Sequence, residues 1–354
     1  MGDALCGLSA FRYYRIPPIV LAAYPPISWV QFKRGGNTPV TDPLLTGPIG
    51  FPIHLLAADK AKCSGAKNIR WHLLSKELPF GSVVEVEELD TGVTSPCMTL
   101  FTLARSVSDV HLLMAMYEFC GTFAVFQPSQ EVETYLERYA AAAPLGANGG
   151  WTRVRDSSGK PTNLWKRPPL IEIEELLAFS AEVEHLRGGK HFSKLAHMVS
   201  GVTASPFEVQ ISILLSLPRV KGGEGLLGFL NNFEVRFSRD ARQISNKERA
   251  YADIYFEGDD KHLPLAIECQ GGIVHSGKAA SMSDADRMLA LQSMGVDVLP
   301  LTYRQIANAD NFRRIVRQVA KKLDRPYREK TNRMLVRERD LRRELFIDWL
   351  TLGE

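Results

Sequence analysis

The sequence predicts an α/β protein with a C-terminal core, built as a mixed central sheet flanked by helices, and a separate α+β N-terminal domain. Beyond residue 204 the apolar residues switch several times between helical and alternating periodicity, which is typical of helices packed on a sheet. The chain has 354 residues, of which 45% are hydrophobic, enough for two domains with cores of their own. Proline and glycine cluster from residue 141 onward and indicate a boundary. We therefore expect domains at 1–140 and 204–354, joined by a linker and helices at 141–203.

The elements of the C-terminal domain are the best marked. Ser205-Pro206 predicts a helix start, because the hydroxyl caps the helix and proline fits its first turn. That helix should run to Leu217, before Pro218. The order that follows is three strands, a helix, a strand and an amphipathic helix. We expect them at 232–237, 252–256, 263–269, 283–294, 296–301 and 311–323.

The N-terminal half has weaker signals. Residues 1–50 are rich in proline and glycine, so we expect irregular, extended structure there. Alternating apolar residues predict strands at 69–73 and 83–86. Residues 141–169 should form a loop or linker. Helices are expected at 96–105, 108–119, 171–186 and 190–199.

Composition restricts the class of protein. No stretch of 18 apolar residues is present, so we expect no membrane span. The first 18 residues do not have the pattern of a signal peptide. The five cysteines form no CxxC pair, which suits a reducing compartment and argues against a structural zinc site. We therefore expect a cytoplasmic protein.

The net charge of +3 is unevenly distributed. Residues 1–203 carry 19 basic and 19 acidic residues, whereas 204–354 carry 24 and 21. Between 311 and 343 there are 13 basic and 4 acidic residues, a local excess of nine. Such a stretch can neutralise the phosphates of nucleic acid, but it can equally be a solvated helix face. Candidate DNA contacts are Arg313, Arg314 and Arg317.

Two carboxylates could form a metal site. Asp253 lies within one predicted strand and Glu268 at the end of the next, 15 positions later. Adjacent strands could bring them together, and paired carboxylates bind Mg²⁺. That ion can polarise a phosphate and lower the pKa of an attacking water. The alternative is a pair of ordinary strand-end acids that face solvent.

Four motifs then resemble one family. Residues 265–275, LAIECQGGIVH, are similar to the IExDGxxH strand and loop of very-short-patch-repair-like endonucleases, which belong to the PD-(D/E)XK superfamily. Residues 284–295 resemble the DxxRxxxLxxxG helix of that family, 251–256 its preceding strand and 205–208 its opening SxxE helix. The resemblance covers about 120 residues. It implies a restriction-endonuclease-like core that cleaves DNA with Mg²⁺ or Mn²⁺.

The resemblance also implies roles for single residues. Asp253 would be the central metal ligand and Glu268 the second. Glu208 would support the metal or its waters. His275 would be a general acid or base, or a phosphate contact.

Two further positions bear on catalysis. The family resemblance implies that Arg287 pairs with Asp284 or contacts a phosphate. Gln270 departs from the family, which usually has lysine or aspartate there. A glutamine side chain cannot act as a base, although it can orient a water or coordinate weakly through its carbonyl.

Function therefore has two readings. One is a metal-dependent DNA endonuclease of defence or repair. The other is a catalytically silent DNA-binding regulator that keeps the fold.

The N-terminal region has a resemblance of its own. Residues 70–127 resemble the region that precedes nuclease-like domains in abortive-infection antitoxin-type proteins; the residues that carry this likeness are Ser95-Pro96, Thr99, Leu103-Ala104 and Glu118–Gly121. A scaffold packed on the nuclease core explains this region equally well. A homodimer and a partner protein of a defence system both stay open.

Overall fold

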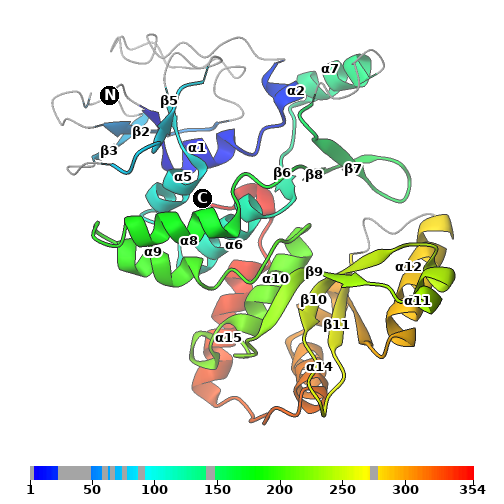
Figure 1. The fold of residues 1–354 in the computed structure, drawn as a ribbon. Helices are drawn as coiled ribbons and strands as arrows, with labels where there is room; N and C mark the ends of the chain where they lie inside the picture. The colour runs from blue at the N-terminus through cyan, green and yellow to red at the C-terminus, as the bar shows by residue number, and fades with distance from the viewer. Residues whose placement is uncertain are drawn as a thin grey trace. The chain divides into compact units, whose positions relative to one another are not determined.

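The computed structural model describes residues 4–22, 49–57, 63, 68–73, 78–86, 92–140, 148–271 and 278–354. The chain forms two compact units (Figure 1). Unit 1 comprises Met1–Thr152, Asn163–Val199 and Trp349–Glu354, and unit 2 comprises Arg153–Thr162 and Ser200–Asp348. The main passage between the units is thus at Ser200, and the last residues of the chain return to unit 1.

Unit 1 contains a mixed sheet with the strand order β3-β2-β1-β5-β4. Its strands are β1 (Ala4–Leu5), β2 (Ile53–Ala57), β3 (Ile69–Leu73), β4 (Val83–Val84) and β5 (Gly92–Thr94). β2 is buried along its whole length, and it pairs antiparallel with β1 and parallel with β3. The sequence predicts β3 and β4, but not the other three strands.

Two helices near the N-terminus correct the expectation of extended structure over 1–50. They are α1 (Gly7–Tyr13) and the short α2 (Pro18–Leu21). Ala10 and Phe11 are fully buried, so packing rather than local sequence signals stabilises α1. Pro18 stands in the first turn of α2, where its missing N–H costs nothing. Residues 23–48 lie outside the described part of the chain.

Serine side chains cap two predicted helices of unit 1. In α5 (Pro96–Leu103) the Ser95 hydroxyl accepts a bond from the Met98 N–H, and in α6 (Asp109–Cys120) Ser108 does the same for His111. α6 is buried from Leu112 to Cys120 and forms much of the core. The predicted helices of the next segment are α8 (Ile173–Glu182) and α9 (Gly189–Ala196). α7 (Gln130–Ala140) is an unpredicted helix.

A hairpin replaces much of the linker expected at 141–169. Its strands are β7 (Thr152–Arg155) and β8 (Pro161–Lys166), and β8 also pairs with β6 (Phe123–Val125). The Asp156 carbonyl accepts a 3.0 Å bond from the N–H of Gly159, which has a φ of +83° that glycine adopts without strain. The polar residues that suggested a linker therefore close a turn.

Unit 2 is built on a mixed sheet with the order β12-β11-β10-β9. Its strands are β9 (Phe229–Arg236), β10 (Arg249–Phe256), β11 (Leu265–Gln270) and β12 (Asp297–Thr302). The first three run antiparallel, and β12 is parallel to β11. All four strands were predicted. The α/β class, with mixed sheets flanked by helices, is confirmed.

Helices cover both sides of this sheet. α11 (Arg239–Ser245) and α12 (Lys278–Ser293) lie on one side, where their apolar residues pack against Ala250 and Ala252 of β10; α10 (Pro206–Ser216) and α15 (Asn332–Leu345) lie on the other (Figure 1). α11 interrupts the predicted order, because it stands between the first two strands. The elements that complete unit 2 are η2 (Arg219–Lys221), α13 (Tyr303–Ala307) and α14 (Ala309–Lys322).

The last residues, which include η3 (Trp349–Thr351), pack within unit 1. The Trp349 ring stands edge-on to Phe123, and its carbonyl accepts a 2.8 Å bond from Arg15. Among the described helices none is long and apolar enough to cross a membrane.

Candidate functional site

Asp253 and Glu268 meet where the pairing of β10 and β11 ends. The register runs from Phe256 opposite Leu265 to Ile254 opposite Ile267, so these two acids are the next facing pair. There the Asp253 carboxylate accepts a 2.6 Å hydrogen bond from the backbone N–H of Cys269. Glu268 is 2% exposed. Continued by one position, the register sets the two strand acids opposite each other.

Glu208 is the third carboxylate of the cluster. It lies in the first turn of α10, where one carboxylate oxygen accepts from the Ser205 hydroxyl and the other from the Ala204 N–H, both at 2.7 Å. Burial, and next the charge of Asp253, raise the pKa of Glu208 to about 8, while these two hydrogen bonds oppose the rise. Glu268 adds a smaller effect in the same direction. Glu208 thus lies close enough to Asp253 and Glu268 for their charges to act on it.

Arg287 supplies a positive charge to this cluster. It extends from α12, and its guanidinium lies 2.7 Å from the Glu268 carboxylate and donates a 3.2 Å bond to the Tyr251 carbonyl. The partner that the family resemblance implies, Asp284, has a side chain outside the described part. Arg287 therefore places a positive charge directly beside Glu268.

The donor set fits a hard cation. Mg²⁺ prefers oxygen ligands, and it typically takes one or two carboxylates and keeps several waters. Asp253 and Glu268 supply such a pair. Burial and the nearby Asp253 charge raise the pKa of the Cys269 thiol well above its usual range, so this residue offers no thiolate that would favour a soft metal. Among the described residues no group of three or more histidine, cysteine or acidic side chains is arranged to hold an ion.

Asn231 is a buried polar residue that sequence reasoning missed. Its amide donates to the Ser212 hydroxyl of α10 at 2.8 Å and to the Asp253 carbonyl of β10 at 3.1 Å. Its carbonyl oxygen accepts from the Ser200 hydroxyl at 2.7 Å. Asn231 therefore fixes the helix that carries Glu208 against the strand that carries Asp253.

The remaining motif residues follow β11. Gln270 is the last residue of that strand, half-buried and opposite Thr302 of β12. Since side chains alternate along a strand, Gln270 points to the same side as Glu268. His275 lies outside the described residues, so its predicted role is not tested.

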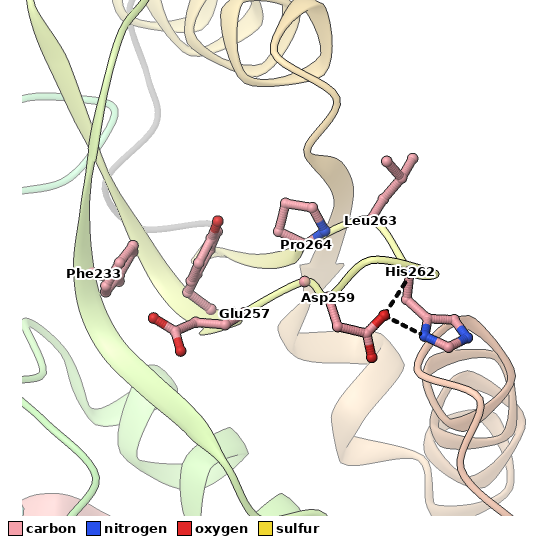
Figure 2. A pocket seen from close by; sticks show the side chains of 8 residues that line it. Phe233, Glu257, Asp259, His262, Leu263 and Pro264 are labelled. Atoms are coloured by element: carbon pink, nitrogen blue, oxygen red, sulfur yellow. Dashed lines mark hydrogen bonds and ion pairs between the residues drawn. The ribbon is translucent and has the colours of Figure 1, made fainter.

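An open hollow of about 550 Å³ lies elsewhere in unit 2. It is lined by the loop between β10 and β11 and by the stacked rings of Phe233 and Tyr255, and it contains the Asp259–His262 hydrogen bond (Figure 2). This loop joins the two strands at the end of their ladder opposite to Asp253 and Glu268. The hollow therefore lies mainly at the loop end of the ladder, and its lining residue Phe233 pairs with Ala252, next to Asp253.

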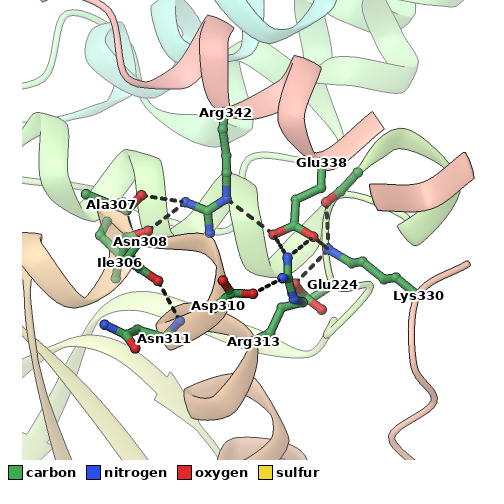
Figure 3. Close-up of polar contacts among 11 residues, drawn as sticks. Glu224, Ile306, Ala307, Asn308, Asp310, Asn311, Arg313, Lys330, Glu338 and Arg342 are labelled. Atoms are coloured by element: carbon green, nitrogen blue, oxygen red, sulfur yellow. Dashed lines mark hydrogen bonds and ion pairs between the residues drawn. The ribbon is translucent and has the colours of Figure 1, made fainter. Parts of the chain in front are cut away.

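Arg313, a predicted DNA contact, is part of an internal ionic network. Its guanidinium donates to both oxygens of Glu338 at 3.0 and 3.1 Å and also pairs with Asp310 (Figure 3). Arg317 pairs with Glu329 on the surface, whereas Arg314 is exposed. Of the three arginines, Arg314 is thus the best placed to meet a phosphate.

The same network holds α15 in place. The Lys330 ammonium is buried and donates to Glu224 at 2.8 Å, to Glu338 at 3.0 Å and to the Gly222 carbonyl at 2.9 Å. Arg342 joins Glu338 to the carbonyl groups at the end of α13 (Figure 3). Much of the predicted basic stretch therefore serves the fold.

Comparison of the chain with protein-family models, with curated proteins and with solved structures found no match. The likeness of residues 205–323 to very-short-patch-repair-like endonucleases accordingly stays an expectation from four motifs. The carboxylate cluster of unit 2 is the feature that any function must explain.

Proposed function

We propose that unit 2 is a metal-dependent endonuclease that hydrolyses phosphodiester bonds in DNA. The convergence of Asp253, Glu268 and Glu208 at the end of the β10–β11 ladder supports this proposal. Burying like charges together costs stability, and such clusters with a strongly shifted pKa are common at functional sites. A divalent cation would relieve the repulsion.

Each residue has a role in this proposal. Asp253 and Glu268 would hold the cation, which when bound would supply activation of a water and stabilisation of charge on the phosphate. Arg287 orients the Glu268 carboxylate through their ion pair. Gln270, on the same side as Glu268, can hydrogen-bond an attacking water. By the motif, His275 would move the proton, since an ordinary histidine pKa near 6.5 suits that task.

The second candidate is a DNA-binding protein that does not cleave. Gln270 favours it, because the family position usually holds lysine or aspartate. The first reading nevertheless explains more, since a silent binding protein has no need to keep three acids together. The loss of one positioned group typically slows an enzyme by about 10²–10⁴-fold, which leaves activity that can be measured.

A plasmid assay distinguishes the two readings. The purified protein is incubated with supercoiled plasmid, single strands and mismatched duplex in Mg²⁺ or Mn²⁺. We expect slow, metal-dependent cleavage that Asp253→Ala and Glu268→Ala abolish. Asp240→Asn, which removes an exposed acid from α11, is the matched control and should cleave like wild type.

Gln270→Lys and Gln270→Asp should preserve or raise the cleavage rate. Their effect tests whether the glutamine alone makes the enzyme slow. If the wild-type protein binds DNA and cleaves none of these substrates with any divalent metal, the nuclease proposal fails and the silent binding protein replaces it.

A further inference from the structure

A group of polar side chains extends from the carboxylate cluster along the exposed side of β9 and β10. Arg249 and Tyr251 alternate with Ala250 and Ala252, which are buried against the core on the side of α11 and α12. Arg249 and Tyr251 therefore point away from that core, and both are exposed. Alternate residues of a strand repeat every ~6.6 Å, so Tyr251 is about one such step and Arg249 about two steps from Asp253.

The β9 side chains opposite complete this group. Arg236 faces Arg249 and Glu234 faces Tyr251 in the register. The Glu234 carboxylate accepts bonds from Arg249 and Tyr251 at 2.9 Å and from Arg236 at 3.1 Å. We call these four residues the β9–β10 platform.

The charges of the platform favour an anion. Two arginines directly opposite each other on neighbouring strands are unfavourable by themselves. Hydrogen bonds from Arg249, Tyr251 and Arg236 lower the pKa of Glu234 to about 2, so it stays ionised, but it offsets only one of the two positive charges. The Arg236 side chain is 87% exposed and that of Arg249 53%. Each guanidinium therefore presents further donors to solvent, in the planar geometry that suits phosphate.

The platform is also linked to the carboxylate cluster. Arg287, which pairs with Glu268, donates to the Tyr251 carbonyl at 3.2 Å. The Tyr251 hydroxyl is in turn held by Glu234. The Tyr251 carbonyl is thus bonded to Arg287 of the carboxylate cluster, and the Tyr251 hydroxyl is bonded to Glu234 of the platform.

We propose that the β9–β10 platform binds the sugar–phosphate backbone of the DNA strand next to the bond that is cut, with Arg236 and Arg249 as phosphate contacts. This inference rests on the proposed nuclease function, because it places the substrate beside Asp253 and Glu268. The exposed ring of Tyr251 adds a surface on which a base or sugar can pack. An edge strand also carries charge to prevent pairing with other chains, and that is the alternative explanation.

The test is binding without cleavage. A fluorescent duplex oligonucleotide is titrated in EDTA, between about 50 and 200 mM salt, so that no catalytic step enters. The variant is Arg236→Ala with Arg249→Ala. The matched control is Arg239→Ala with Lys261→Ala, which removes two exposed positive charges of the same unit from α11 and from the loop between β10 and β11.

We expect weaker binding by the platform variant, with the slope of log affinity against log salt reduced by about 2, close to one per phosphate contact. The control should retain the wild-type slope. A platform variant that matches the control in affinity and slope would overturn the proposal, and self-association of that variant would support edge protection instead. Since EDTA removes the metal, this result is independent of whether the wild type cleaves plasmid.

Discussion

Acidification should destabilise unit 1 through a buried histidine pair. The ring nitrogens of His54 and His72 lie 3.0 Å apart, and the residues are 3% and 9% exposed. Burial lowers the pKa of each to about 4; the charge of His72 and then Arg70 and Arg12 contribute for His54, and Arg70 and Arg105 contribute for His72. Both rings are therefore neutral in the folded protein at pH 7.

The sign of the effect follows from proton binding. In the unfolded chain a histidine is protonated near pH 6.5, whereas in the folded protein each of these two rings is protonated only near pH 4. Between these values the unfolded state binds more protons, so stability falls as the pH falls. From pH 7 to pH 5 the linkage relation gives a loss of about 2 kcal/mol for each histidine, against a total stability of about 5–15 kcal/mol for an ordinary domain.

Urea unfolding followed by tryptophan fluorescence measures this loss, because Trp71, Trp151, Trp165 and Trp349 all belong to unit 1. His72→Gln removes one titrating ring and should roughly halve the dependence on pH. His185→Gln, which replaces an exposed histidine of the same unit that bonds only to a backbone carbonyl among the described contacts, is the matched control for the substitution. A wild-type stability that does not change between pH 7 and 5, or a His72→Gln profile equal to that of wild type, would refute this reasoning.

Two further substitutions test the interior of unit 2. Lys330→Met leaves Glu224 and Glu338 without their shared buried cation and should cost about 3–5 kcal/mol in urea unfolding followed by circular dichroism, so a loss below about 1 kcal/mol would contradict the network. Asn231→Ala removes the bonds to Ser212 and to the Asp253 carbonyl and should cost about 1–3 kcal/mol. It should also slow plasmid cleavage in folded protein, whereas normal cleavage would show that the residue only supports the fold.

Local signals account for most of what the sequence predicts about unit 2. Ser205-Pro206 defines the start of α10 within its own few residues, and alternation defines β10 and β11. The helix α1 could not be predicted in this way, because its stability depends on burial against residues far away in the chain. The hairpin turn at 156–159 was not predicted for a different reason, because the same polar residues suit both a linker and a hairpin turn.

The candidate site divides in a similar way. The adjacency of the two strands that carry Asp253 and Glu268 could be predicted from their order in the sequence. The register that sets these acids opposite each other could not, because the ladder begins at Leu265 and not at the predicted residue 263. The role of Asn231 could not be predicted from the sequence. Its partners lie 19 and 22 residues away, one in a helix and the other in a neighbouring strand. Arg313 looked like a phosphate contact for the same reason: its partner Glu338 is 25 residues distant.

The neutral side chain of Gln270 can also affect how tightly the cluster binds a cation. Asp253, Glu268 and Glu208 lie together, and Arg287 already places a positive charge beside Glu268, where the proposed cation would be held. At an effective dielectric constant near 20, unit charges about 4–6 Å apart interact by roughly 3–4 kcal/mol, which is large compared with the 1.4 kcal/mol of a tenfold change in affinity. A lysine at 270 would stand on the same side of β11 as Glu268 and oppose the ion that this residue is proposed to bind. Glutamine avoids that repulsion. Gln270→Lys can therefore raise the cleavage rate at saturating metal and still require more Mg²⁺ to reach it, so the assay must vary the metal as well as the residue.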